Sequence, residues 1–235
     1  MRNSFVTVTA RSGDGSWNGN VMSAFSLNRR RILSLWLPRL PIDRIRRSSA
    51  GPDNTPSVVV AKENNALQIY ALDDKAARCG LETGQPLANA RAICPELMVF
   101  DADEVADAKI LDDIADWCDR FTPLVALDPP HGLFLDITGC AHLFGGEAAL
   151  LRMICGALTW QGFVVSAAIA STSVCARTLT RGSPGRIVKN GEEAEAVNPL
   201  PVSATSMRML RSRSSVRIVN VPPAGIASSA FSTRF

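Results

Sequence analysis

The stretch Gly132-Leu133-Phe134-Leu135-Asp136-Ile137-Thr138-Gly139 decides the fold of this chain. Its apolar residues are typical of a buried strand, and the Thr-Gly pair ends that strand in a turn. Asp136 is the only charged residue inside the run. A carboxylate at a strand end suits a magnesium ligand, because Mg²⁺ prefers hard oxygen donors. The residues just upstream, Asp128-Pro129-Pro130-His131, place two prolines and a histidine where a catalytic strand needs acids.

Around this strand the sequence predicts alternating strands and helices. Apolar β-branched runs predict strands at 31–37, 58–60, 66–70, 97–100, 163–170 and 187–188. Helical spacing and capping residues predict helices at 42–47, 72–79, 86–93, 103–121, 151–158 and 171–180. This order predicts an α/β (α+β) fold, with a ferredoxin-type split βαβ sheet that carries a helical insert.

The composition is that of an ordinary globular chain, with 46% hydrophobic and 20% charged residues in 235. No apolar run approaches the ~18 residues of a membrane helix. The six cysteines form no CxxC pair, which favours reduced core cysteines and a cytoplasmic location. We expect residues 1–28 to be a disordered extension, 29–202 the folded domain, and 203–235 a Ser- and Arg-rich tail of low order.

Charge is unevenly distributed although the net charge is only +3. Arg44, Arg46 and Arg47 form a basic cluster that suits a polyanion such as DNA, and an exposed, solvated face is the simpler interpretation. The acidic residues of the helix at 103–121 are expected to form a solvated face.

Four segments occur in the order and at the spacing of the Y-family translesion DNA polymerases: Leu33–Ile45, Leu72–Pro95, Phe134–Gly146 and Val165–Pro201. The chain from Arg31 to Val202 resembles that family. The resemblance implies a palm-like sheet, a helical fingers insert and a passage into a thumb near Val202.

The sequence departs from the family where its chemistry resides. Members that polymerise carry an Asp-Met-Asp-like motif where this chain has Trp36-Leu37-Pro38, and a Ser-Ile-Asp-Glu-like motif where it has Pro129-Pro130-His131-Gly132. Two Mg²⁺ ions need several oxygen ligands, which these side chains do not offer. The resemblance therefore makes Trp36, Pro38, His131 and Gly132 degenerate former catalytic positions.

Positions that contact the nucleotide in the family are altered as well. Asp74 and Ala77 stand where the fingers carry a tyrosine and an arginine, and Thr172-Ser173 replace an Asn-Lys pair. Arg177 keeps a positive charge where the family has a phosphate-contacting lysine. We expect no catalytic residue, no metal site and no cofactor, and we expect DNA contact through Arg44, Arg46, Arg47 and Arg177.

This combination resembles the ImuB-type, catalytically silent homologues of the bacterial SOS response to DNA damage. The resemblance implies an adaptor in translesion synthesis and DNA repair. Its implied partners are DNA, an error-prone replicative-type DNA polymerase, a RecA-like accessory protein, and the sliding clamp if the C-terminal regions were present. On this interpretation residues 203–235 are a truncated thumb region.

Two other functions stay open at this stage. The chain is an active error-prone nucleotidyltransferase if Asp136 and a second acid such as Asp128 bind Mg²⁺ together. It is an inactive fragment if the missing regions are needed for folding or binding.

Individual residues also have simpler interpretations. We expect Asp136 to bond a nearby turn, Trp36 to fill the core, and His131 to be an exposed loop histidine. Cys140, His142 and His131 do not have the spacing of a common zinc site.

Overall fold

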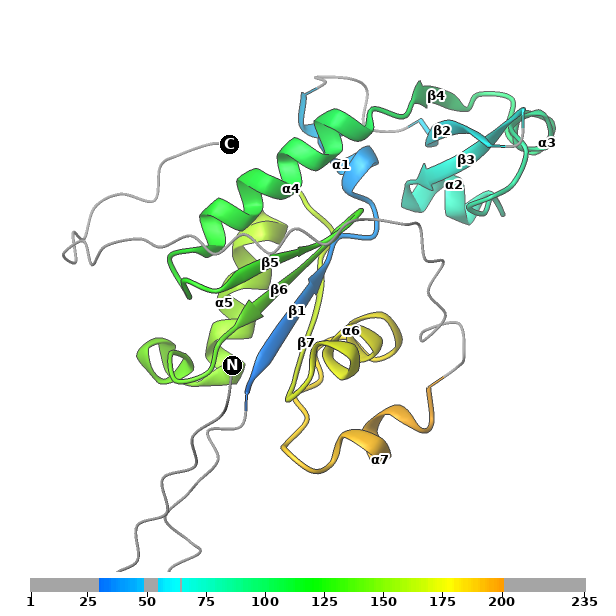
Figure 1. Ribbon diagram of the computed structural model, residues 1–235. Helices are drawn as coiled ribbons and strands as arrows, with labels where there is room; N and C mark the ends of the chain where they lie inside the picture. Colours follow the sequence, from blue (N-terminus) through cyan, green and yellow to red (C-terminus); the bar gives the residue numbers. More distant parts are fainter. Residues whose placement is uncertain (1–29, 49–54, 64, 201–235) are drawn as a thin grey trace, which may run out of the picture.

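The structure is a computed structural model and describes residues 30–48, 55–63 and 65–200. These residues form two β-sheets with helices packed around them (Figure 1). The expected disordered extension at 1–28 and the tail at 203–235 lie outside the described residues.

The larger sheet, called the central sheet below, contains the apolar stretch that begins at Gly132. Its strands lie in the order β5 (Val125–Asp128), β6 (Gly132–Asp136), β1 (Ile32–Trp36) and β7 (Ser166–Ala170). Every neighbouring pair is antiparallel. The strand predicted at 132–137 is therefore an inner strand, paired on both sides.

Alternation along the strands divides the central sheet into two faces. One face carries Leu33, Leu35, Leu133 and Leu135, which pack against α4 (Glu104–Cys118) and α5 (Glu147–Trp160) in the largest apolar cluster. The opposite face packs Ala168 and Ala170 against α6 (Ser173–Gly182) and α7 (Glu193–Val197). Each fully buried leucine contributes about 1.5–3 kcal/mol, so these clusters fix which face each helix covers.

A smaller sheet lies in the chain between β1 and α4 (Figure 1). Its order is β3 (Ala66–Leu72), β2 (Ser57–Glu63) and β4 (Met98–Asp101), with β2 antiparallel to β3 and parallel to β4. Two short helices accompany it, α2 (Asp74–Arg78) and α3 (Leu87–Ile93). Asn65 has a left-handed φ of 62°, which suits a tight hairpin turn between β2 and β3.

Helix α1 (Leu40–Ser48) joins the two sheets. Its Ile42 is buried together with Val59 and Ala71 of the smaller sheet. Its other contacts reach the central sheet region, where the backbone N–H of Val164 donates to Asp43 at 2.8 Å. Burial raises the pKa of this carboxyl to about 6.

The mixed α/β architecture confirms the predicted fold class. Asp103 caps α4 as predicted, since its side chain accepts from the Ala106 N–H at 2.9 Å. Thr172, one residue after the predicted start at 171, caps α6. The prediction missed β5 and α7, because each is only four or five residues long and lacks a clear period.

The part of the chain that the structure describes contains no helix long and apolar enough to cross a membrane.

A short 3₁₀ helix, η2 (Ala141–Phe144), follows β6 and leads into α5.

Candidate functional site

The register of β1 and β6 brings together the positions that the sequence predicts to be degenerate catalytic positions. Trp36, the last residue of β1, lies directly opposite Gly132, the first residue of β6. Beyond this pair, the Leu37 N–H donates to the carbonyl oxygen of His131 at 2.9 Å. Pro38 follows Leu37 in the chain. Residues 36–38 and 131–132 therefore meet at one end of the central sheet, which we call the silent centre.

The carboxylate nearest to this centre is already engaged. Asp128, at the end of β5, pairs with Gly132 in the sheet. An oxygen of its carboxylate lies 3.0 Å from the Arg177 guanidinium, which reaches it from α6. Burial raises the pKa of the Asp128 carboxyl, and the two nearby arginines, Arg177 and Arg181, act against that rise.

Gly132 is a glycine for a steric reason. A Cβ atom at this position would lie 2.8 Å from the backbone oxygen of Asp128 and 3.0 Å from its carboxylate. Real side chains do not tolerate such a contact with backbone. The observed position of Asp128 and an acidic side chain at residue 132 therefore exclude each other.

Arg181 covers the aromatic ring of Trp36. Its guanidinium carbon lies 5.3 Å from the ring centroid, within the range of a cation–π contact. Burial lowers the pKa of Arg181, and the charge of Arg177 lowers it further. Trp36 is half-buried rather than fully enclosed, so the prediction of a core tryptophan is corrected. The ring faces α6 because Trp36 lies on the same side of β1 as Ser34.

His131 is not the exposed loop histidine that the sequence suggested. It is half-buried, its Nε2 lies 3.3 Å from the hydroxyl of Tyr70, and the two rings meet edge to face at 5.7 Å. Burial, with help from the Arg181 charge, lowers the pKa of His131 to about 4. This histidine is therefore neutral near pH 7, and it connects the central sheet to β3 of the smaller sheet.

The lowered pKa predicts an acid-dependent loss of stability at His131. The unfolded chain binds this proton near pH 6.5, whereas the folded chain does so only near pH 4. Between these values the unfolded state binds more protons, so stability falls as the pH decreases. His131→Gln removes this loss. We expect urea unfolding to show wild type losing roughly 2–4 kcal/mol relative to the variant between pH 7 and pH 4.

The raised pKa of Asp43 makes stability rise as the pH falls from about 6 to 4, which is opposite to the effect of His131. Asp43 is present in both wild type and His131→Gln, so its contribution cancels in the difference between them. Parallel stability curves for wild type and His131→Gln would contradict the assignment.

The three arginines of the basic cluster on α1 bind mainly to other residues of this chain. Arg44 pairs with Asp107 of α4 at 2.6 Å, and Asp107 is 4% exposed. Burial raises the pKa of Asp107, and Arg44 opposes that rise. The expected solvated acidic face of α4 is therefore wrong at Asp107, whose carboxylate faces α1.

The other two members of the cluster have partners as well. Arg46 donates to Asp73 at 2.6 Å, and the Arg47 guanidinium carbon lies 4.3 Å from the centroid of the Phe163 ring. Arg46 is the most exposed of the three. DNA contact by Arg44, Arg46, Arg47 or Arg177 stays a prediction, and the structure gives each of them a role inside the fold.

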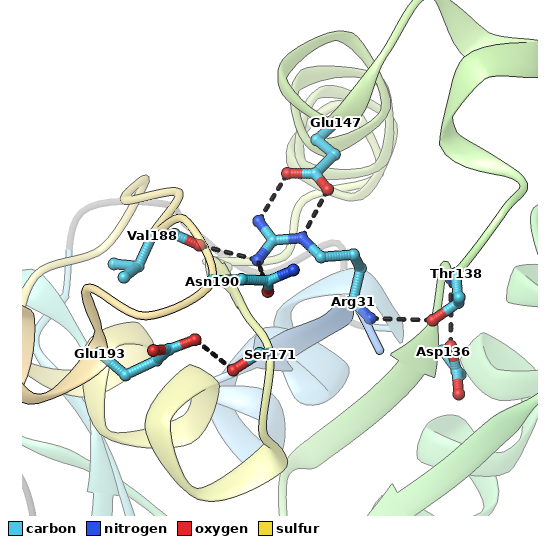
Figure 2. Close-up of polar contacts among 8 residues, drawn as sticks. All are labelled: Arg31, Asp136, Thr138, Glu147, Ser171, Val188, Asn190 and Glu193. Carbon is cyan, nitrogen blue, oxygen red and sulfur yellow. Dashed lines mark hydrogen bonds and ion pairs between the residues drawn. The ribbon is translucent and has the colours of Figure 1, made fainter. Parts of the chain in front are cut away.

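Asp136 lies at the far end of β6 from the silent centre. It is opposite Ile32, and its carboxylate accepts from the Thr138 N–H at 3.0 Å, in agreement with the expected turn (Figure 2). A strand rises about 3.3 Å per residue, so Asp136 and Gly132 are separated by about 13 Å along β6. Asp128 and Asp136 therefore do not share one site.

Figure 2 shows what occupies that far end. The Arg31 guanidinium makes two bonds to Glu147 of α5, at 2.6 and 2.7 Å, and others to the Val188 carbonyl and to Asn190. A two-bond arginine–carboxylate pair fixes orientation as well as distance. This cluster joins β1 to α5 and to the segment before α7. Among the residues that the structure describes, the acids drawn beside Asp136, Glu147 and Glu193, are already bonded to Arg31 and Ser171.

The side chains of the silent centre do not fit the pair of Mg²⁺ ions that polymerising members of the Y-family bind. An indole, a glycine and a neutral imidazole provide no carboxylate oxygen, and the Asp128 carboxylate is bonded to Arg177. Among the described residues, no three acidic, histidine or cysteine side chains gather as possible metal ligands, and this includes Cys140, His142 and His131.

Comparison with known proteins identifies the family. The family model described as impB/mucB/samB matches residues 49–181, more than half of the chain. The chain belongs to the impB/mucB/samB family. This assignment confirms the Y-family resemblance drawn from the sequence.

The curated relatives of this impB/mucB/samB chain are of two kinds. It is 46% identical over 126 residues to "Protein ImuB" of Caulobacter vibrioides, a match that covers 53% of this chain and 28% of the relative. It is 27% identical over 139 residues to "DNA polymerase IV 2" of Mesorhizobium japonicum, covering 57% and 34%. The matched region is thus about a third or less of each relative's length.

Solved structures with a similar fold include DNA polymerases. The insertion ternary complex of Dbh DNA polymerase gives a TM-score of 0.64 at 14% identity, covering 74% of this chain and 53% of that one. DinB from Sulfolobus solfataricus gives 0.57, covering 69% and 49%. At this identity the likeness establishes the fold of the impB/mucB/samB chain.

Sequence reasoning missed three contacts around the silent centre: Tyr70 with His131, Arg181 with Trp36, and the ion pair of Asp128 with Arg177. Arg181 lies four residues after Arg177 in the predicted helix, so helical spacing alone could have placed both on one face. Tyr70 belongs to a strand of the other sheet, and no local pattern indicates its contact with His131.

Proposed function

We propose that this chain is a catalytically silent Y-family polymerase homologue that acts as an adaptor in damage-induced translesion synthesis. The observation that carries the proposal is the silent centre. Its strand positions hold Trp36 and Gly132, and the nearby carboxylate of Asp128 is neutralised by Arg177. Two-metal nucleotidyl transfer needs free carboxylates at this place. The similarity to a protein named ImuB supports the same function.

DNA is the first partner in this proposal. Basic side chains that bind phosphates release counterions, so such binding weakens steeply as salt increases. Arg46, on the last turn of α1, is the most exposed member of the basic cluster and is the first candidate for a phosphate contact. A role on chromosomal DNA places the protein in the cytoplasm, within the SOS response.

Protein partners follow from the proposed adaptor role. They are an error-prone replicative-type DNA polymerase, a RecA-like accessory protein and, where the C-terminal regions of the family are present, the sliding clamp. The folded unit that presents these contacts is residues 29–202.

The test combines binding with activity on the same purified chain. Fluorescence anisotropy with a labelled primer–template measures DNA binding over a range of salt concentrations, and gel assays with Mg²⁺ and all four nucleotides measure primer extension. We expect salt-sensitive DNA binding without extension. Immobilised chain is expected to retain the replicative-type polymerase partner.

Magnesium-dependent extension that disappears in Asp136→Asn would overturn the proposal in favour of an active nucleotidyltransferase. A folded chain that binds neither DNA nor the partner polymerase would show that this chain alone does not act as an adaptor.

A further inference from the structure

One side of α5 is apolar although it is open to solvent among the described residues. Residues three and four apart lie on the same side of a helix, and four of them form a stripe that carries no charge, called the α5 stripe: Ala149, Met153, Gly156 and Trp160. Met153 is 45% exposed and Trp160 is 83% exposed. The solvent side of a helix usually carries charged and polar residues. An uncharged stripe with an exposed tryptophan is therefore typical of a surface that another segment covers.

The chain enters the described fold beside the first turn of this helix. The backbone N–H of Arg31 donates to the hydroxyl of Thr138 at 2.8 Å. The Arg31 guanidinium makes two bonds to Glu147, the first residue of α5 (Figure 2). The part of the chain that precedes residue 30 is therefore attached next to one end of the α5 stripe.

The sequence of this preceding part suits an apolar, uncharged surface. Residues 15–28 contain no charged residue. Val21, Phe25 and Leu27 are separated by even numbers of residues, which places their side chains on one side of an extended chain. Asn28 follows them, and asparagine favours turns. A turn there would direct residues 21–27 back along α5.

The lengths of the two segments also match. Seven extended residues, 21–27, span about 20 Å at about 3.3 Å per step. The helix rises about 1.5 Å per residue, so Glu147 and Trp160 are separated by about 20 Å along α5. The segment is thus long enough to reach Trp160 from the attachment point at Arg31.

We propose that residues 21–27 of this chain cover the α5 stripe, with Leu27 near the start of the helix and Phe25 further toward Trp160. The segment is tethered at Arg31, so its effective concentration at the stripe exceeds that of a separate molecule. Its apolar side chains would remove the Trp160 ring from water. The inference does not depend on the adaptor function.

The experiment uses the full chain and measures the solvent accessibility of the Trp160 indole by NMR. A neutral gadolinium chelate broadens the signals of groups that solvent reaches. The Trp160 indole N–H is identified as the signal that is missing in Trp160→Phe. We expect this signal to keep its intensity in the wild type when the chelate is added, because residues 21–27 cover the ring.

Two variants separate residues 21–27 from the rest of the N-terminal segment. The double variant Phe25→Asp, Leu27→Asp places two charges against the apolar stripe, and we expect the chelate to abolish its Trp160 signal. The matched control, Phe5→Asp with Val8→Asp, adds the same charges outside residues 21–27 and is expected to keep the signal. Trp117, which is 8% exposed in the core, provides an internal reference for folding in every sample.

Three results would overturn the proposal. Loss of the Trp160 signal in the wild type would show that the ring is open to solvent. Equal loss in both double variants would show that residues 21–27 are not the covering segment. Protection that disappears on dilution of the wild type, together with a change from dimer to monomer in light scattering, would show that a second copy of the chain covers the stripe.

Discussion

Replacing Gly132 by glutamate is expected to lower the free energy of unfolding by roughly 3–5 kcal/mol and to give no nucleotide incorporation. The substitution restores the acid that polymerising relatives of the family are expected to carry at this position. Its Cβ would lie 2.8 Å from the backbone oxygen of Asp128, and its carboxylate would enter a region that already holds the Asp128 carboxylate. Backbone of β5 must therefore move, and two like charges approach each other.

Urea unfolding of wild type and Gly132→Glu measures the loss. Gly156→Ala is the matched control, because a Cβ at Gly156 meets nothing within 4 Å and the residue is in the exposed middle of α5. A helical glycine replaced by alanine gains about 0.5–1 kcal/mol. A Gly132→Glu variant as stable as wild type, or one that extends a primer with Mg²⁺, would show that the silent centre is only a few substitutions from an active site.

Asp73→Ala is the second change with a large expected effect, a loss of roughly 3–5 kcal/mol. Asp73 has no exposed surface and makes three bonds. Its carboxylate caps α2 by accepting from the Ala76 N–H at 2.7 Å, accepts from the Ser57 N–H at 3.1 Å, and pairs with Arg46 of α1 at 2.6 Å. Alanine leaves two buried backbone donors, the N–H groups of Ala76 and Ser57, and the Arg46 guanidinium without their acceptor.

The neighbouring acid provides the control for this measurement. Asp74 also pairs with an arginine, Arg39, which directly precedes α1, but the side chain of Asp74 is 70% exposed. An exposed ion pair contributes at most about 1 kcal/mol, so Asp74→Ala should unfold close to the wild-type denaturant concentration. Equal losses for the two variants would mean that burial of Asp73 does not hold α2 and α1 together.

The sequence predicts the framework of the molecule well, because its main elements carry strong local signals. The apolar run at 133–137 and the capped period of α4 confirm this, since both depend on neighbouring residues alone. Short elements such as β5 are not predictable in the same way. Four residues carry no usable period, and β5 is a strand because β6 offers it a partner.

In the candidate site, too, local sequence features were predictable and long-range contacts were not. Absence of acids at Trp36 and Gly132 is visible in the sequence, but what replaces them is not. The Asp128–Arg177 pair and the contact of His131 with Tyr70 join residues 49 and 61 positions apart, and the sequence predicted neither. The sequence also failed to predict the position of Asp107. Its pattern places Asp107 on a solvated acidic helix face, but the side chain is buried against Arg44.

The most direct test of the silent centre is paramagnetic broadening by Mn²⁺, which replaces Mg²⁺ at carboxylate sites and broadens nearby NMR signals. The observed signals are the backbone amides of Trp36, Leu37 and Gly132 and the indole N–H of Trp36. If the silent centre binds no metal, Mn²⁺ leaves all four signals as sharp as those of the buried β7 residues, with or without nucleotide. Selective, saturable broadening at these four signals would show that a metal binds between β1 and β6, and would contradict the account.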